Sequence, residues 1–316
     1  MDEFFFPSSL AGPDKPIPAL DLISMEKNRE IIYIDPMVDF GFKKIFKDSG
    51  KKQLIIRPLN AIFGLDIEDI DIRESEQLGL TEQERKVTYD MLCTTKEGRS
   101  FIIEVQLAEQ LHFMERAIFY SSRTITNKAQ RGPWDYDFKP VFFLGFLNFD
   151  IRHLDPEKAD PSRFIHKFSL LEEETNELMS RALRFAFMEV ARFDKTIEEC
   201  KSFEDRFLYL MKNLPTFAEK PELWDDMDPY FNDLMEEASF ANLSWEEQEK
   251  YIASMKQKWD YQNTLDFAEM KGREAGKEEG REEERIVNAR NLLKLGVPVK
   301  TISEGLGLTE EEIAAL

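Results

Sequence analysis

Cysteine and long apolar runs are both scarce in this chain of 316 residues. Its two cysteines, Cys93 and Cys200, cannot form a disulfide framework, so we expect a reducing, cytoplasmic setting. No stretch approaches the roughly 18 to 20 apolar residues that span a bilayer, and we expect no membrane partner. The acidic, proline-broken start of the chain does not have the pattern of a secretion signal.

Several common site motifs are also missing. The three histidines, His112, His153 and His166, have no metal-ligand spacing, which argues against a zinc site. Neither a G-x-x-x-x-G-K-[ST] loop nor a G-x-G-x-x-G turn occurs, which argues against nucleotide hydrolysis and dinucleotide binding.

Basic residues are outnumbered, and the formal net charge is −20. Phosphate contacts need Lys and Arg, so this balance alone argues against a nucleic-acid partner. The charge is uneven, however. By count, residues 31–160 carry about −4 and the residues after 160 carry about −13. The acidic half favours solubility, and the N-terminal half is where a polyanion would be tolerated.

The clearest local structure is a hairpin. VTYDMLCTT (87–95) and SFIIEVQLA (100–108) are both typical of strands. The residues between them include Lys-Glu-Gly (96–98), which fits a three-residue loop with glycine in the left-handed position. Such a loop pairs Thr95 with Arg99.

Counting outward from this loop pairs Asp90 with Glu104. Directly opposed residues of antiparallel strands share a face, with Cβ atoms roughly 5 Å apart. Gln106 lies two residues beyond Glu104 and shares that face. The hairpin therefore gathers an Asp, a Glu and a Gln on one surface. The opposite face is apolar and is expected in the core: Phe101, Ile103, Val105 and Leu107.

Flanking segments complete an α/β pattern. Residues 35–63 contain two helical pieces, a helix is expected from Glu109 to about Gln130, and the apolar run 140–149 is typical of a doubly buried strand. This order predicts a mixed sheet packed between helices. Apolar residues make up 42% of the chain and include 26 phenylalanines, enough for a substantial core.

Beyond residue 160 we expect helices, over 172–214 and 222–263. The glycine-repeat segment KGREAGKEEGREEER is either a solvated helix or a flexible linker. Three short helices follow it, resembling a small helix-turn-helix bundle that favours oligomerisation or partner docking. The predicted divisions are an N-terminal arm or lid (1–30), a core (31–160), a helical accessory region (161–264), the charged linker or helix (265–285) and the helical tail (286–316).

The hairpin face suits metal-dependent phosphodiester hydrolysis. Mg²⁺ takes oxygen ligands, usually one or two carboxylates plus waters and substrate oxygens. Asp90 and Glu104 would supply the carboxylates, and Gln106 could contact the attacking water. The spacing alone is weak evidence, because many solvated hairpin faces carry such residues.

The ordered set of motifs resembles the PD-(D/E)xK nuclease family transposases, or Rpn recombination-promoting nucleases. The resemblance covers about residues 31 to 316. It is carried by Asp39, Phe42, Lys43 and Phe46; Asp90; Ile103-Glu104-Val105-Gln106; Arg116 and Tyr120; Gln130 and Gly132; Pro140-Val141; Phe187-Met188-Glu189; and Leu210-Met211-Lys212-Asn213.

The resemblance implies a restriction-endonuclease-like core that cuts DNA with Mg²⁺ or Mn²⁺ and promotes recombination or transposition in a bacterial cytoplasm. Asp90 and Glu104 would be the metal ligands, and Gln106 stands where most such enzymes have a catalytic lysine. The resemblance gives Asp39 and Lys43 supporting roles.

Arg116 and Tyr120 lie one helical turn apart. They either face the cleft or pack the helix on the sheet.

Two alternatives to an active nuclease follow from the same residues. In the first, the fold is retained as a nucleic-acid-binding or protein-binding module that no longer cuts, because Gln106 brings no charge. In the second, the acidic helical half is a scaffold and the nuclease core is vestigial. Apart from these alternatives, we expect a homo-oligomer that forms through the C-terminal helices.

Overall fold

A computed structural model describes residues 31–73, 76–77, 87–128, 135–151, 160–219, 221–222, 224 and 228–316. The expected N-terminal arm and the motif residues Gln130 and Gly132 lie outside this part of the chain. The chain divides after Met255 into two compact units.

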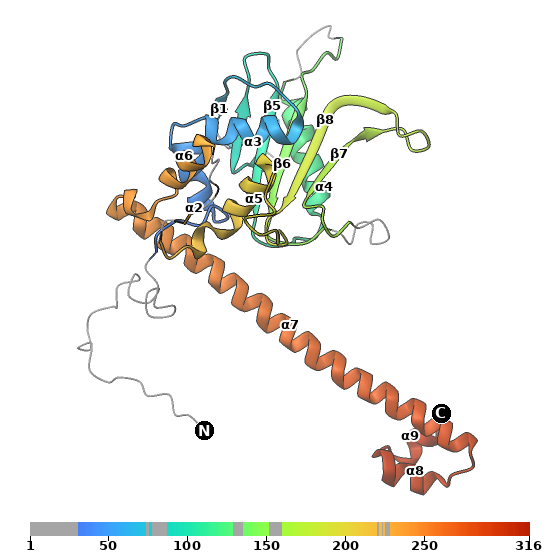
Figure 1. Ribbon diagram of the computed structural model, residues 1–316. Coiled ribbons are helices and arrows are strands. Elements are labelled where there is room, and N and C mark those ends of the chain that lie inside the picture. The colour runs from blue at the N-terminus through green and yellow to red at the C-terminus, as the bar shows by residue number, and fades with distance from the viewer. Residues whose placement is uncertain are drawn as a thin grey trace, which may run out of the picture. The chain divides into compact units, whose positions relative to one another are not determined.

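The first unit is built on a mixed six-stranded sheet (Figure 1). Three neighbouring strands, β5, β6 and β8, run parallel, and antiparallel strands flank them on both sides. Across the sheet the order is β1 (Asp71–Arg73), β4 (Met91–Thr94), β5 (Ser100–Gln106), β6 (Val141–Leu147), β8 (Leu178–Glu189) and β7 (Ile165–Leu171). A separate pair joins β2 (Glu76–Gln77) to β3 (Val87–Thr88).

The hairpin between β4 and β5 has the expected register. Leu92 pairs with Ile102, and the Thr95 N–H donates to the Arg99 carbonyl at 3.0 Å. Gly98 closes the loop with φ of 86°, a conformation that glycine adopts without steric cost. The turn residue and the loop length therefore set this register.

Helices cover both faces of the sheet (Figure 1). Helix α4 (Phe113–Thr126) packs through Phe113 and Ala117 on the face that carries Ile102 and Phe143. The opposite face is covered by α2 (Asp39–Phe42), the π-helix η1 (Lys43–Asp48), α3 (Gln53–Phe63), α5 (Phe203–Asn213) and α6 (Pro229–Glu237). This arrangement confirms the α/β mixed sheet with flanking helices.

The helical pattern expected over 172–214 is wrong for its first part. Residues Leu178–Glu189 form strand β8, and β7 pairs with it. Leu, Met, Arg and Ala in this segment all favour helix intrinsically. Pairing with β6 overrides that preference, because it buries Phe185 and Phe187 on the sheet. The sheet therefore extends beyond the core expected to end at residue 160.

Beyond β8, the regular elements of the described residues are helices and short 3-10 turns. A 50-residue helix, α7 (Trp245–Lys294), includes the glycine-repeat segment, which is therefore a helix. The second unit ends in two short helices that bury Ile302 and Ile313 against Ala289. Thr309 and Glu312 form the expected capping box. The remaining elements are η4 (Leu214–Thr216), η5 (Phe240–Asn242), α8 (Val299–Leu306) and α9 (Glu310–Ala314).

Within the described residues, no helix combines the length and apolar character needed to cross a membrane.

Candidate functional site

The structure brings Asp90 and Glu104 together at the predicted position. Asp90 directly precedes β4, and its carboxylate accepts from the Val105 N–H at 2.7 Å. The Asp90 N–H donates to Oε1 of Glu104 at 3.2 Å. Each residue is thus held by the other's strand, which keeps the two acidic side chains adjacent.

Both carboxyl groups are held in an environment that disfavours their charge. Glu104 is only 5% exposed. Burial, and then the neighbouring Asp90 charge, raise the pKa of Glu104. Burial also raises the pKa of Asp90, and the Val105 N–H offsets this only in part. Two buried acids with mutual repulsion are costly to ionise without a nearby cation.

Gln106 joins this pair from the same strand. Its side chain is buried, and its Nε2 donates to Oε2 of Glu104 at 3.3 Å. Its Oε1 accepts from Nη2 of Arg116 at 2.6 Å. The predicted trio of Asp90, Glu104 and Gln106 is therefore one connected cluster.

Arg116 and Tyr120 reach the cluster from α4. The Arg116 guanidinium lies 5.5 Å from the centre of the Phe113 ring and 5.9 Å from that of Tyr120. Burial, and then the Glu104 charge, raise the pKa of Tyr120. Tyr120 also packs edge-on against Tyr89, with ring centres 5.3 Å apart. Both residues therefore face the site while packing the helix on the sheet.

Asp39 and Lys43 approach from the opposite side. They form an ion pair of 2.7 Å, with side chains 60% and 34% exposed respectively. Burial is the main cause of the raised Asp90 pKa, and among the nearby charges Asp39 raises it further while Lys43 lowers it. Lys43 is the first residue of the π-helix η1, an irregularity frequently found at functional sites.

Another buried carboxylate, Glu189, lies at the same end of the sheet, where the parallel strands β5, β6 and β8 finish. The parallel register places Gln106 beside Leu147, and Leu147 beside Glu189. Oxygens of Glu189 contact Nε2 of His166 at 3.0 Å and accept from Nε of Arg192 at 2.7 Å.

The Ile151 N–H adds a third contact to Glu189, at 2.7 Å. Burial acts to raise the pKa of Glu189, but the contacts with His166, Ile151 and Arg192 outweigh it, and the pKa is lowered.

Two further residues, Gly145 and Gln110, contribute to the site, and neither was predicted from the sequence. Gly145 pairs with Glu104, and a Cβ atom there would lie 2.8 Å from the Phe187 ring. The side-chain oxygen of Gln110 accepts from Nη1 of Arg116. A glycine in an apolar run signals close packing, but nothing in the sequence marks Gln110.

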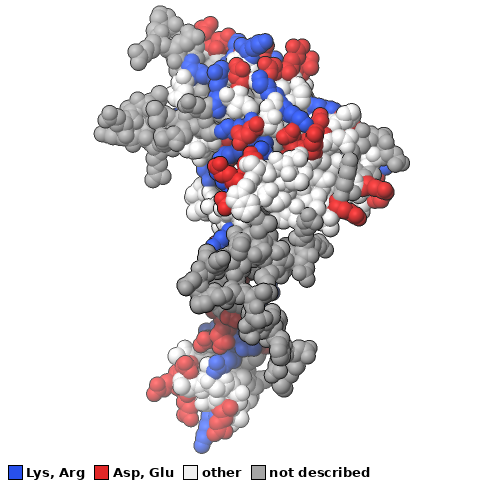
Figure 2. Space-filling view, turned by 90° about the vertical axis from the view of Figure 1, so that its left-hand side faces the viewer, with Lys and Arg blue, Asp and Glu red and all other residues white. Residues whose placement is uncertain are grey.

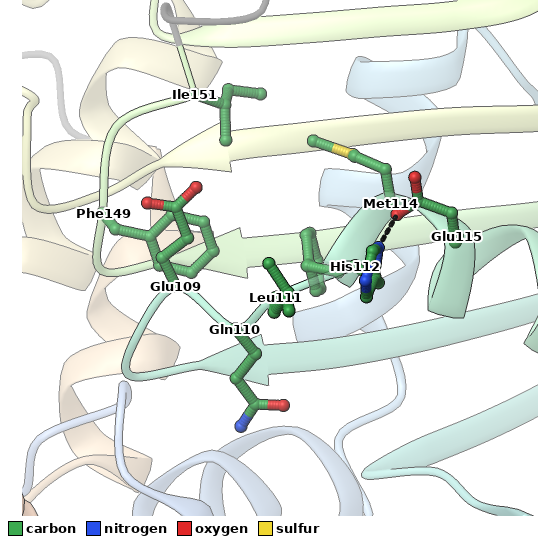
Figure 3. A pocket seen from close by; sticks show the side chains of 9 residues that line it. Glu109, Gln110, Leu111, His112, Met114, Glu115, Phe149 and Ile151 are labelled. Atoms are coloured by element: carbon green, nitrogen blue, oxygen red, sulfur yellow. Dashed lines mark ion pairs between the residues drawn. The ribbon is translucent and has the colours of Figure 1, made fainter.

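A cavity of about 490 Å³ lies next to the cluster and shares Gln110 with it (Figure 3). The start of α4 and the loop before it provide one wall, and the segment after β6 provides another. It is lined by Glu109, Gln110, Leu111, His112, Phe113, Met114, Glu115, Phe149 and Ile151. These side chains are mostly apolar or acidic, so the cavity does not suit a phosphate.

The surface charge is mixed. On the face drawn in Figure 2, the Lys and Arg side chains of the described residues are interspersed with Asp and Glu. Binding of a polyanion on this face would depend on a few placed cations, because no broad basic area gathers there among them.

The donor set fits a hard divalent cation. Two adjacent carboxylates with raised pKa values supply the oxygen ligands and the negative charge that Mg²⁺ or Mn²⁺ requires. Among the described residues, no group of three His, Cys, Asp or Glu side chains is placed to hold a metal ion. The remaining ligands would therefore be water and substrate oxygens, as is usual for Mg²⁺.

Residues 36–268 match the family model of the PD-(D/E)XK nuclease family transposases. The chain belongs to this family. The match covers most of the chain, including the whole sheet and the site, and supports a nuclease-like or transposase-related function acting on DNA. Enzymes of this superfamily generally use divalent metals. Neither the curated proteins nor the solved structures include a match.

Proposed function

We propose that this family member is an active DNA endonuclease, with Asp90 and Glu104 as the ligands of Mg²⁺ or Mn²⁺. The observation that supports this most is the pair of adjacent carboxyls: burial raises both pKa values, and the Asp90 charge raises that of Glu104 further. Protein interiors rarely keep such a pair unless a cation or a reaction uses it. A bound divalent ion would polarise the scissile phosphate and lower the pKa of the attacking water.

The neighbouring side chains fit supporting roles in this reaction. Gln106 carries its amide at the cluster and can hold a water or a phosphate oxygen by hydrogen bonding. Lys43 is partly exposed beside Asp90 and can contact a DNA phosphate, while Asp39 holds its ammonium group. Tyr120 completes the wall of the site on α4.

Nicking of supercoiled plasmid by the purified full chain tests the proposal. We expect nicking with Mg²⁺ or Mn²⁺ and none with a chelator. Glu104→Gln keeps the side-chain volume but removes a ligand charge, and should reduce the rate by at least about 100-fold. Glu173→Gln is the matched control, because Glu173 is exposed in the turn before β8, and it should leave the rate unchanged.

One alternative also has an observation in its favour. The site offers two acidic ligands, and its neutral Gln106 brings no positive charge of its own. A binding module that has lost cutting would look the same in these respects. Absence of nicking by the wild type with several metals, together with retained DNA binding, would establish that alternative.

The wider role follows from the family and from the helical C-terminal part. We propose that cutting promotes DNA recombination or transposition in a bacterial cytoplasm, and that the C-terminal helices within residues 265–316 mediate homo-oligomerisation. Light scattering on the full chain and on a chain truncated before residue 265 tests the second point. An unchanged mass on truncation would contradict it.

A further inference from the structure

The orientation of the Gln106 amide is set by two partners of opposite character. Arg116 has only hydrogen-bond donors, and its Nη2 lies 2.6 Å from Oε1 of Gln106. The amide oxygen must therefore face α4, and the NH2 group must face the carboxylates. An ionised Glu104 accepts hydrogen bonds only, and its Oε2 lies 3.3 Å from Nε2 of Gln106. Arg116 requires this orientation whatever the protonation state of Glu104, and an ionised Glu104 requires it as well.

Arg116 is itself held firmly enough to impose this choice. Its guanidinium donates to the side-chain oxygen of Gln110 through Nη1 and lies against the rings of Phe113 and Tyr120. Rotating the Gln106 amide by half a turn would place N–H groups against the guanidinium and an oxygen against the Glu104 carboxylate. Both contacts would become repulsive, so the amide has one stable orientation.

We propose that Arg116 is a positioning residue that keeps Gln106 as a hydrogen-bond donor at the site and prevents it from acting as a metal ligand. This inference rests on the proposed nuclease function and gives Gln106 a specific role in it. The Gln106 oxygen is engaged by Arg116, so the protein contributes two metal ligands, Asp90 and Glu104. The second N–H of the amide then serves an oxygen of the attacking water or of the phosphate.

The arrangement also brings positive charge into a site whose strand residues have none. The Arg116 guanidinium lies one hydrogen bond from Gln106, and its charge lowers the pKa of both Asp90 and Glu104 against the larger effect of burial. Hydrogen-bonded groups polarise one another, so the hydrogen bond from the Arg116 guanidinium to the amide oxygen makes the Gln106 N–H groups stronger donors.

Four variants of the full chain test the inference. Arg116→Met keeps the apolar stem over the two rings and removes the guanidinium. Gln106→Met removes the amide at similar volume, and the double variant combines the two. Arg181→Met is the matched control, because Arg181 is exposed near the start of β8, at the opposite end of the sheet from the site.

Mn²⁺ affinity is measured by calorimetry, without DNA. We expect Arg116→Met and Gln106→Met each to bind Mn²⁺ within about threefold of the wild type, a change under 1 kcal/mol. Glu104→Gln should bind far more weakly. A tenfold or greater loss in Gln106→Met would overturn the inference, because it would make Gln106 a ligand.

Cleavage kinetics give the second readout. Arg116→Met and Gln106→Met should each lower kcat by about 100-fold, as expected for loss of one placed donor, with KM for DNA little changed. The double variant should be no slower than the slower single variant, because both changes remove one function. Additive losses, or a rise in KM alone, would show that Arg116 acts on DNA independently of Gln106. Arg181→Met should match the wild type in both constants.

Side-chain NMR separates this inference from the proposed function. In the wild type, the two amide protons of Gln106 should have well-separated shifts and exchange slowly with solvent. In Arg116→Met, exchange should be faster and the shifts should converge. An unchanged Gln106 signal in Arg116→Met would overturn the inference. If the wild type neither binds Mn²⁺ nor cuts DNA, the proposed function fails, and the NMR result still decides how Gln106 is oriented.

Discussion

Glu104 and Glu189 are two buried glutamates near the same end of one sheet, but their pKa values are shifted in opposite directions. Burial acts to raise the pKa of each. For Glu104, the neighbouring Asp90 carboxyl adds to the effect of burial, so its pKa stays raised. Glu189 has His166, Arg192 and the Ile151 N–H, and its pKa is lowered.

The comparison separates a structural charge from one available for binding. The protein supplies the partners of Glu189, which ties the segment after β6 to the end of β8. It does not supply a cation of matching charge to the pair formed by Glu104 and Asp90, where Arg116 and Lys43 compensate only in part. A divalent ion would complete this site, whereas Glu189 has no need of one.

The largest expected difference between the two glutamates comes from Glu189→Ala. This change leaves His166 and Arg192 without their buried partner and should lower the free energy of unfolding by about 3 to 5 kcal/mol. Thermal unfolding of the metal-free protein measures it, with Glu173→Ala as the exposed control. A loss below about 1 kcal/mol would place Glu189 among ordinary surface charges.

Mg²⁺ should stabilise the wild type and not Glu104→Gln. At a concentration 100-fold above the Kd, a ligand that binds only the folded state adds about 2.7 kcal/mol. The effect should be larger at pH 8.5 than at pH 6, because the Glu104 pKa is raised to about 8 and binding requires the ionised form. Equal stabilisation of the wild type and Glu104→Gln by Mg²⁺ would mean that the metal does not bind at Glu104.

Glu104→Gln should make the metal-free protein more stable, the opposite of a change at Glu189. A carboxyl with a raised folded pKa costs stability as pH rises above its unfolded value of about 4.3 and up to the folded value. Removing the charge should therefore add at least about 1 kcal/mol at pH 8, since each unit of raised pKa costs about 1.4 kcal/mol, and little at pH 4. Chemical unfolding at the two pH values checks this. A destabilised variant at pH 8 would mean that Glu104 is as well compensated as Glu189.

His166→Phe should have the smallest effect. It removes one of three partners of Glu189 and leaves Arg192 and the Ile151 N–H in place. The expected loss is about 1 kcal/mol, the usual contribution of one hydrogen bond. Thermal unfolding of His166→Phe and Glu189→Ala side by side shows whether the three partners each contribute to stability. A loss in His166→Phe equal to that in Glu189→Ala would contradict this.

The parts of the site that the sequence predicted depend on local rules. The Gly98 turn and the alternation along β5 were enough to pair Asp90 with Glu104 and to place Gln106 on their face. The apolar face of β5 and the doubly buried β6 also follow from their own residues.

The parts that could not be predicted depend on contacts between distant segments. Strand β8 has helix-favouring residues and becomes a strand only because β6 is beside it. The same holds for the Glu189 cluster, which needs β7, β8 and the segment after β6 together. The hydrogen bond from Arg116 to Gln106 requires the docking of α4 on the sheet, which no spacing rule supplies.

The hairpin that carries Asp90 and Glu104 has a consequence for how the chain folds. The two acids are 14 residues apart and meet across a single tight loop. A hairpin of this kind closes in about 1 to 10 μs, well before distant segments such as β8 can pair. We therefore expect the acidic pair to meet early in folding, when water still surrounds it and its repulsion costs little. Most of that cost arises later, as α4 and the N-terminal helices dock and exclude solvent, so it should slow the last steps of folding more than the first.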